Sequence, residues 1–321
     1  MNTRVSIVIV NWNSGVLLQK CVSSIYANHS GLVDQIIVVD NASVDESVSR
    51  LSDCERHGVP LVQIRNTQNR GFAAACNQGA ALASSKYLLF LNPDAELLSG
   101  ALETCHAYLE ERGHEAVGVV GVQLEDGMGN IARSCAYRPS PARLLAYSLG
   151  IDRIPQVRSA GVVMNGWSHN TIRTVDHVIG AFFFARRSVF VALDGFDERF
   201  FVYYEDLDYS SRMADLGYRS VYLAGARARH LGGGVSRQVK SLRLFYSVRS
   251  RLLYSFKHFS VAEATLVLLA AVTVEPVLRI ILAAFTGSAE DLRNTLVAYR
   301  MLYAELPKIR RMVTKPPGSR R

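Results

Sequence analysis

Short apolar runs alternate with amphipathic stretches over the first third of the chain. The runs have the length of strands and lie at residues 5–10, 36–40, 61–64 and 87–91. After the first run, apolar side chains recur at helical spacing, at positions 17, 18, 21, 22 and 25. Strand and helix alternate four times at short spacing, which predicts a parallel sheet with right-handed crossovers. Further strands are expected at residues 117–122, 178–185 and 220–224.

Every early strand is followed by polar residues that can bind a ligand. These residues are Asn11 and Asn13, Asp40 and Asn41, Asn66 and Asn69, and Asn92 and Asp94. In a parallel sheet the carboxyl ends of the strands share one edge, so the clusters should converge on one cleft. The chain has no GxGxxG after its first strand and no GxxxxGK[ST]. We therefore expect a nucleotide site in which a cation, rather than a glycine loop, offsets the phosphate charge.

The segment that places the main candidate ligand is residues 87–96, in which the apolar strand stops at Asn92-Pro93. Proline cannot donate to a strand ladder, so the strand ends there and places Asp94 just beyond it. A carboxylate at that position can bind a divalent cation through hard oxygen ligands. The alternative is that Asp94 caps a helix beginning near Ala95.

Two other segments have local signals. Ser43 and Glu46 form a Ser-x-x-Glu pattern, which predicts a capping box and a following helix. Residues 127–169 are rich in Gly, Ser, Pro and Arg and are expected to form a long loop that shapes a substrate pocket.

A second acidic site is predicted in residues 195–209. Glu205 and Asp206 are adjacent and begin a helical apolar pattern, so Asp206 should lie in the first turn of a helix. Aromatic neighbours favour a raised pKa for one of the two carboxyls, as a general base requires. The alternative is that these acids only cap a helix. Gly180 would let a substrate approach the backbone closely, and a neutral His230 reaching toward Asp94 would complete a mixed nitrogen and oxygen metal site.

Charge is distributed unevenly along the chain. Residues 227–321 hold 17 Lys and Arg against 5 Asp and Glu, whereas the first 226 residues hold 19 against 23. The basic part contains an apolar stretch, 261–287, whose longest run without a charged residue is 11 residues, short of the about 20 that a bilayer span needs. This pattern predicts helices lying on an anionic membrane surface. The alternative is that this stretch forms a buried helical hairpin, packed on the catalytic domain or on a second subunit. In the second case the protein would be a homo-oligomer.

The composition also bears on nucleic-acid binding and on the cellular compartment. In the basic C-terminal region, the Lys and Arg residues alternate with aliphatic runs and not with aromatic side chains that could stack on bases. We therefore expect no nucleic-acid partner. Five scattered cysteines without a CxxC pair suit a reducing compartment, and the N-terminus has no secretory apolar region. We expect a cytoplasmic protein, peripheral on the inner face of the cytoplasmic membrane.

The order of these motifs resembles the inverting, GT-A-fold glycosyltransferases of family 2, most closely bacterial rhamnosyltransferases. The resemblance covers about the first 235 residues. It is carried by residues 10–13, 39–43, 69–77, 92–94 and 196–208, and by His230.

The resemblance implies an α/β domain over residues 1–235, with a mixed, mainly parallel sheet. The charge and apolar pattern predicts a helical, basic, membrane-apposed region over 236–321. It implies that Asp40 recognises the nucleobase, in a pocket lined by Val10, Asn11 and Asn13. Residues along the nucleotide-sugar would be Asn69, Gly71, Phe72, Asn77 and Asn92.

In the family's terms, Asn92-Pro93-Asp94 matches the DxD metal motif, with Asn92 replacing its first acid. Asp94 and His230 would bind Mg²⁺ or Mn²⁺, and Asp206, beside Glu205, would be the general base. The donor would be dTDP-L-rhamnose and the acceptor a saccharide of the cell wall, O-antigen or another polysaccharide, free or linked to polyprenyl diphosphate.

Two alternatives remain open at this point. One is a UDP-sugar donor, such as UDP-galactofuranose or UDP-N-acetylglucosamine. The other is a catalytically inactive nucleotide-sugar-binding membrane scaffold, which the replacement at Asn92 keeps open.

Overall fold

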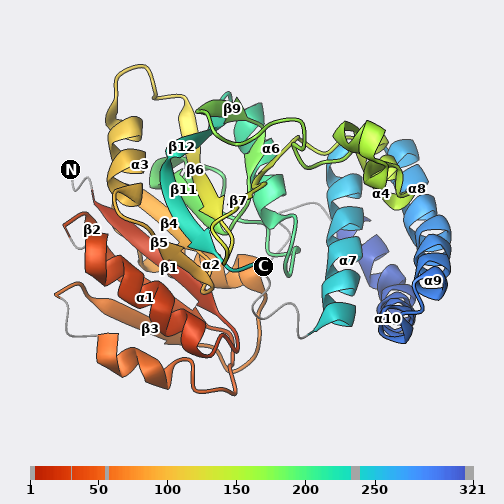
Figure 1. The fold of residues 1–321 in the computed structure, drawn as a ribbon, viewed down its shortest axis with the longest axis horizontal. Helices are drawn as coiled ribbons and strands as arrows, with labels where there is room; N and C mark the ends of the chain where they lie inside the picture. Colours follow the sequence, from red (N-terminus) through yellow and green to blue (C-terminus); the bar gives the residue numbers. More distant parts are fainter. Residues whose placement is uncertain (1–3, 30, 55–57, 233–238, 315–321) are drawn as a thin grey trace. The chain divides into compact units, whose positions relative to one another are not determined.

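A computed structural model describes residues 4–29, 31–54, 58–232 and 239–314 (Figure 1). The main sheet consists of β1 (Val5–Asn11), β2 (Val33–Asp40), β3 (Leu61–Arg65), β4 (Tyr87–Leu91), β5 (Ala95–Leu97), β6 (Val117–Glu125), β7 (Ile131–Ala132), β9 (Arg173–Val175), β11 (Phe182–Arg186) and β12 (Arg219–His230). A separate pair is formed by β8 (Cys135–Ala136) and β10 (His177–Val178).

The sheet is mixed and mainly parallel. Its order is β3-β2-β1-β4-β11-β6-β12-β5, and the strands β3, β2, β1 and β4 are parallel to one another. Strand β11 runs antiparallel to both β4 and β6, and β12 is again parallel to β6. The carboxyl ends of β1, β2, β4, β6 and β12 therefore share one edge with the amino end of β11. This confirms the predicted α/β class.

Helices cover both faces of the sheet because the central strands are apolar on both sides. The first face packs against α1 (Val16–His29) and α3 (Ala101–Glu110), whose buried residues join one core with alternate residues of the strands. The other face packs against α2 (Phe72–Leu82), α5 (Arg187–Ala192) and α6 (Glu205–Asp215). Helix α2 lies so close to the sheet that a Cβ on Gly79 would sit 2.4 Å from Val8.

An aromatic cluster anchors α5 and α6 to this second face. It consists of Phe90, Phe183, Phe190, Phe196 and Tyr209, with ring centroids 4.9–6.4 Å apart. Offset and edge-to-face pairs of this kind add about 0.5–1.5 kcal/mol each beyond the burial of area. The start of α6, with its two acids, is thus fixed against the sheet.

The described residues fall into two compact units. The first holds the sheet and comprises residues 1–138, 167–198 and 205–235, and the second comprises 139–166, 199–204 and 236–321. The second unit is helical: α4 (Pro141–Ser148), α7 (Lys240–His258), α8 (Val261–Leu269), a π-helical turn (Ala270–Val274), α9 (Glu275–Phe285) and α10 (Ala289–Thr314).

A buried charge cluster joins the helices of the second unit. Glu275 pairs with Arg251 from α7 and, 2.9 Å away, with Arg279 from its own helix. The Arg251 guanidinium also lies 4.8 Å from the centroid of the Tyr147 ring. Among the described residues one helical segment, Val261–Phe285, is long and apolar enough to cross a membrane, with a mean hydropathy of 2.2. The buried Glu275 lies within that segment and ties it to α7.

Several local predictions were wrong. The alternative of a helix at Ala95, capped by Asp94, is also excluded, because residues 95–97 form β5 and pair with the end of β12. The Ser43 pattern does not start an α-helix either, since its hydroxyl bonds Asp40 and only a 3-10 turn (Ser49–Cys54) follows. The expected loop 127–169 contains α4 and short strands, and the expected strand 178–185 is divided between β10 and β11.

Candidate active site

The first part of the site lies where β1 and β2 end. The Asn11 amide donates to Asp40 Oδ1 at 2.8 Å and to Ser47 Oγ at 2.8 Å. Ser43 Oγ donates to the same Asp40 oxygen at 2.5 Å, and its backbone N–H donates to the other at 3.2 Å. Asp40 is only 7% exposed. The structure thus brings Asp40 and Asn11 together and fixes the carboxylate by a hydroxyl that the sequence pattern had assigned to a helix cap.

Asn13 and Val10 differ in their access to this region. Asn13 adopts a left-handed backbone (φ 51°), and its side-chain oxygen accepts the N–H of Val44 at 2.8 Å. Val10 is buried within β1 beside Val39. Asn13 therefore fixes the loop that follows β1, whereas Val10 is part of the packed strand before that loop.

The start of α2 contains the next group. Gly71 has φ 87°, a conformation that costs glycine nothing, and Asn69 Oδ1 accepts its N–H at 2.9 Å. The Gly71 carbonyl accepts the amide of Asn41 at 3.1 Å, which ties the turn to the end of β2. Phe72, the first residue of the helix, is half-buried.

Asn77 acts on the backbone of a distant segment. Its amide donates to the Phe196 carbonyl at 2.8 Å, and its oxygen accepts the Phe196 N–H at 2.9 Å. A Cβ on Gly195 would lie 2.5 Å from that oxygen. Asn77 therefore holds the segment that leads to α6.

Asp94 and His230 meet where the start of β5 pairs with the end of β12. His230 Nε2 lies 3.2 Å from Asp94 Oδ1, and their side chains are 16% and 11% exposed. The pairing of β5 with β12 creates this contact, because His230 is opposite Ala95 and the Leu231 N–H donates to the Asp94 carbonyl at 3.1 Å.

These two side chains fit a divalent cation whose other ligands come from a substrate. Mg²⁺ commonly takes one or two carboxylates from a protein and completes its shell with waters and phosphates. Within the described ranges no group of three or more His, Cys, Asp and Glu side chains is placed to bind a metal. The chain itself therefore supplies a small donor set here.

Asp206 lies in the first turn of α6, as predicted. Its Oδ2 accepts the Gly180 N–H at 2.8 Å and its Oδ1 accepts the Leu207 N–H at 2.8 Å. Burial by itself raises the pKa of Asp206, but His177 and these two N–H groups outweigh it and lower the pKa below its usual value. The group that approaches Gly180 closely is thus this carboxylate, 3.2 Å from where a Cβ would be.

Glu205 has the opposite environment. It is 4% exposed, and its Oε2 has no hydrogen-bond partner among the described residues. Burial, followed by the neighbouring charges of Asp206 and Asp208, raises the pKa of Glu205 well above its usual value. The pKa values of the two adjacent acids are therefore shifted in opposite directions, a pattern typical of catalytic pairs.

The Asp94–His230 pair and Asp206 lie along the same edge of the sheet. The Asn92 N–H donates to the Ala181 carbonyl at 3.0 Å, and β11 begins opposite the last residue of β4. Asp94 follows Asn92 by two residues, and Gly180, which holds Asp206, immediately precedes Ala181. The segment that contains Asp94 and the segment that contacts Asp206 are therefore joined by one backbone hydrogen bond.

Sequence reasoning missed two features next to Asp206. Tyr203 and Tyr204 both have positive φ (66° and 68°), which is uncommon for bulky residues and often marks a functional site. His177 lies 3.5 Å from Asp206. Neither the two tyrosines nor His177 belongs to a recognisable sequence motif. The one available signal was the position of His177, three residues before Gly180.

The family profile described as Glycosyl transferase family 2 matches residues 6–190. The chain belongs to this family. The match includes the Asp40 and Asp94 sites and ends before Asp206 and His230 of the glycosyltransferase.

Two curated relatives of this glycosyltransferase are rhamnosyltransferases. The N-acetylglucosaminyl-diphospho-decaprenol L-rhamnosyltransferase of Mycobacterium tuberculosis is 24% identical over 70% of this chain and 75% of its own. Rhamnosyltransferase WbbL of Escherichia coli K12 is 28% identical over 54% of this chain and 62% of its own.

Among solved structures, the mannosyltransferase PcManGT from Pyrobaculum calidifontis, in complex with GDP-Man and Mn²⁺, has a TM-score of 0.55. It is 15% identical and the alignment covers 98% of this chain and 81% of that one. This likeness shows the fold, which is GT-A.

Proposed function

We propose that this glycosyltransferase transfers L-rhamnose from dTDP-L-rhamnose to a saccharide acceptor of a cell-wall, O-antigen or similar polysaccharide, carried on polyprenyl diphosphate, with inversion at the anomeric carbon. The observation that carries the proposal is that the Asp94–His230 contact and the Asp206 carboxylate lie at one edge of the sheet. The choice of rhamnose and of a lipid-linked acceptor is supported by the names of the relatives.

In this reaction Asp206 takes the proton of the acceptor hydroxyl as its oxygen attacks the anomeric carbon. The N–H groups of Gly180 and Leu207 orient the carboxylate for that transfer. Asp40, held by Asn11 and Ser43, would accept hydrogen bonds from the nucleobase.

Asp94 and His230 would hold Mg²⁺ or Mn²⁺ at the donor diphosphate. When bound, the cation neutralises the charge that develops on the leaving group. The direct contact between the two side chains supports this assignment, because they need no rearrangement to share one ligand site.

A panel of nucleotide-sugars tests the proposal. Purified full-length protein is incubated with dTDP-L-rhamnose, UDP-galactofuranose, UDP-N-acetylglucosamine and GDP-mannose, each with a polyprenyl-diphosphate saccharide, with Mg²⁺, with Mn²⁺ and with EDTA. We expect transfer from dTDP-L-rhamnose that EDTA abolishes. Transfer from a UDP-sugar instead would replace the donor assignment, and no transfer from any donor would favour the inactive scaffold.

We further propose that the helical unit binds the inner face of the cytoplasmic membrane peripherally. Val277, Ile281 and Phe285 lie at i, i+4 spacing and are 53%, 50% and 90% exposed, and Leu266 and Leu269 are 56% and 51% exposed. An apolar face of this kind next to a strongly basic region suits an anionic bilayer.

Vesicle flotation tests the membrane proposal. Replacing Val277, Ile281 and Phe285 by Ser should reduce cosedimentation with phosphatidylglycerol vesicles severalfold, whereas Met128→Ser, at an exposed apolar residue of the sheet unit, should not. If the triple variant binds normally but changes from oligomer to monomer, the face is a subunit interface instead.

A further inference from the structure

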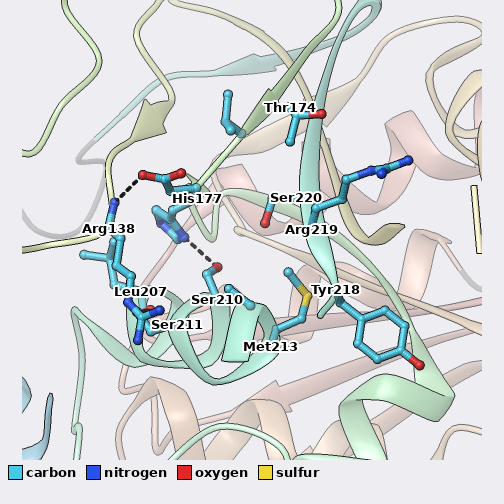
Figure 2. A pocket seen from close by; sticks show the side chains of 13 residues that line it. Arg138, Thr174, His177, Leu207, Ser210, Ser211, Met213, Tyr218, Arg219 and Ser220 are labelled. Carbon is cyan, nitrogen blue, oxygen red and sulfur yellow. Dashed lines mark hydrogen bonds between the residues drawn. The ribbon is translucent and has the colours of Figure 1, made fainter. Parts of the chain in front are cut away.

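His177 lies between two residues of α6 that are one helical turn apart. Its Nε2 is 3.5 Å from Asp206 Oδ2, and its Nδ1 is 2.9 Å from Ser210 Oγ. The residue is 2% exposed, so both contacts are made in a largely dry environment. Figure 2 shows the imidazole directed at Ser210 on α6.

The backbone around His177 is held firmly. In the β10–β8 pair, His177 is opposite Ala136 and Val178 is opposite Cys135. Val178 also packs so closely on Gly121 that a Cβ there would lie 2.6 Å from it. Three residues after His177, Gly180 donates its N–H to the same oxygen of Asp206. One short segment therefore contacts that oxygen from two directions.

We propose that His177 is a positioning residue for Asp206, which holds the carboxylate ionised and aimed at the acceptor hydroxyl. The inference rests on the proposed function, because it assigns a task to a residue beside the proposed base. A buried carboxylate next to a neutral acid needs a donor or cation to stay charged, and the imidazole meets that need.

Other charged groups near Asp206 do not supply this effect. Glu205 and Asp208 are acids on the same helix and disfavour a second charge. The Cys76 thiol from α2 is also near, and burial followed by the charges of Glu205 and Asp206 raises its pKa well above the usual value, so it stays neutral. Within the part of the chain that the structure describes, the groups that lower the pKa of Asp206 against the effect of burial are the His177 side chain and the Gly180 and Leu207 N–H groups.

The far side of His177 lines a pocket of about 290 Å³ whose wall includes Ser210, Ser211, Thr174 and Ser220 (Figure 2). The charged residues of this pocket are Arg138, Asp176 and Arg219. The Arg138 backbone N–H donates to Asp176 at 2.9 Å, and its guanidinium pairs with Asp215 at 2.7 Å. Arg138 and Asp176 thus have partners of their own.

The test compares His177→Leu, His177→Gln and a control, His169→Asn. His169 is also buried, but its ring stacks on Trp167 and bonds the Trp167 carbonyl. In His177→Leu we expect the acid limb of kcat/KM to move to higher pH, with an about tenfold loss on that limb for each unit that the pKa of Asp206 rises. His177→Gln retains an Nε2 donor and should recover most of the activity, and His169→Asn should leave the pH profile unchanged.

A second readout needs no turnover. The carboxyl ¹³C resonance of Asp206, assigned by its loss in Asp206→Asn, should titrate at a higher pH in His177→Leu than in the wild type, and close to the wild type in His177→Gln. An unchanged titration in a folded His177→Leu variant overturns the proposal. If the wild type transfers no sugar from any donor, the proposed function fails, and the carboxyl titration still decides the role of His177.

Discussion

Replacing Asp206 by Asn should remove transfer while leaving the donor site intact. Asn has nearly the same shape but cannot take a proton from the acceptor. The groups expected to bind the donor, Asp40 and the pair Asp94–His230, contact other residues and keep their geometry. The change therefore isolates the proton-accepting step.

The magnitude follows from two separate terms. A positioned general base contributes about 10²–10⁴ in rate, or about 3–5 kcal/mol, so kcat should fall by that factor. In addition, both carboxylate oxygens of Asp206 accept a backbone N–H at 2.8 Å, from Gly180 and from Leu207. An Asn amide can accept only one of them, and the unpaired N–H costs about 1–3 kcal/mol of stability.

The assay separates these two terms. Transfer from radiolabelled donor gives kcat, isothermal titration gives donor affinity, and urea unfolding gives stability. Asp208→Asn is the matched control: Asp208 is a fully buried acid on the same helix, 2.8 Å from Arg212, which also donates to two backbone carbonyls. We expect it to lose stability but to retain transfer. An Asp206→Asn protein that folds and turns over within threefold of the wild type would refute the base assignment.

Three further outcomes are expected. Asp94→Asn or His230→Ala should weaken metal-dependent donor binding about 10–100-fold, measured by titration with and without Mn²⁺. Glu205→Gln should stabilise the protein above about pH 4.3, the usual pKa of an unfolded glutamate. Because the pKa of Glu205 is raised in the folded state, the wild type loses stability as the pH rises from the unfolded pKa to the folded pKa, and glutamine does not titrate. In urea unfolding at pH 4, 6 and 8, the stability of the variant relative to the wild type should therefore increase with pH. Arg251→Met should cost about 3 kcal/mol in urea unfolding, since it leaves the buried Glu275 with Arg279 as its remaining partner in the cluster, and an unchanged midpoint would contradict that account.

Much of the sheet unit could be predicted from residue patterns. Strands buried on both faces are continuous apolar runs, and the polar residues that follow them must lie beyond the strand ends. This placed Asp40 and Asp94 at one edge, and helical spacing placed Asp206 in the first turn of α6. These inferences succeed because they depend on the local backbone alone.

The errors arose where distant segments compete with local propensity. Ser43 could cap a helix, but the Asp40 carboxylate and the Asn11 amide satisfy its hydroxyl instead. Residues 95–97 could begin a helix, but the end of β12 offers them a strand partner. A sequence pattern contains no information about such partners.

The sequence by itself determined most strands and helices of the sheet unit and which polar residues follow its strands. Only the tertiary structure decided which side chains meet: His230 with Asp94, Gly180 and His177 with Asp206, and Asn77 with the backbone of Phe196. Secondary structure depends on neighbours a few residues apart, whereas these contacts join segments brought together by strand order and helix packing. The opposite pKa shifts of Glu205 and Asp206 have the same origin, because burial and partners, not residue type, decide which acid keeps its proton.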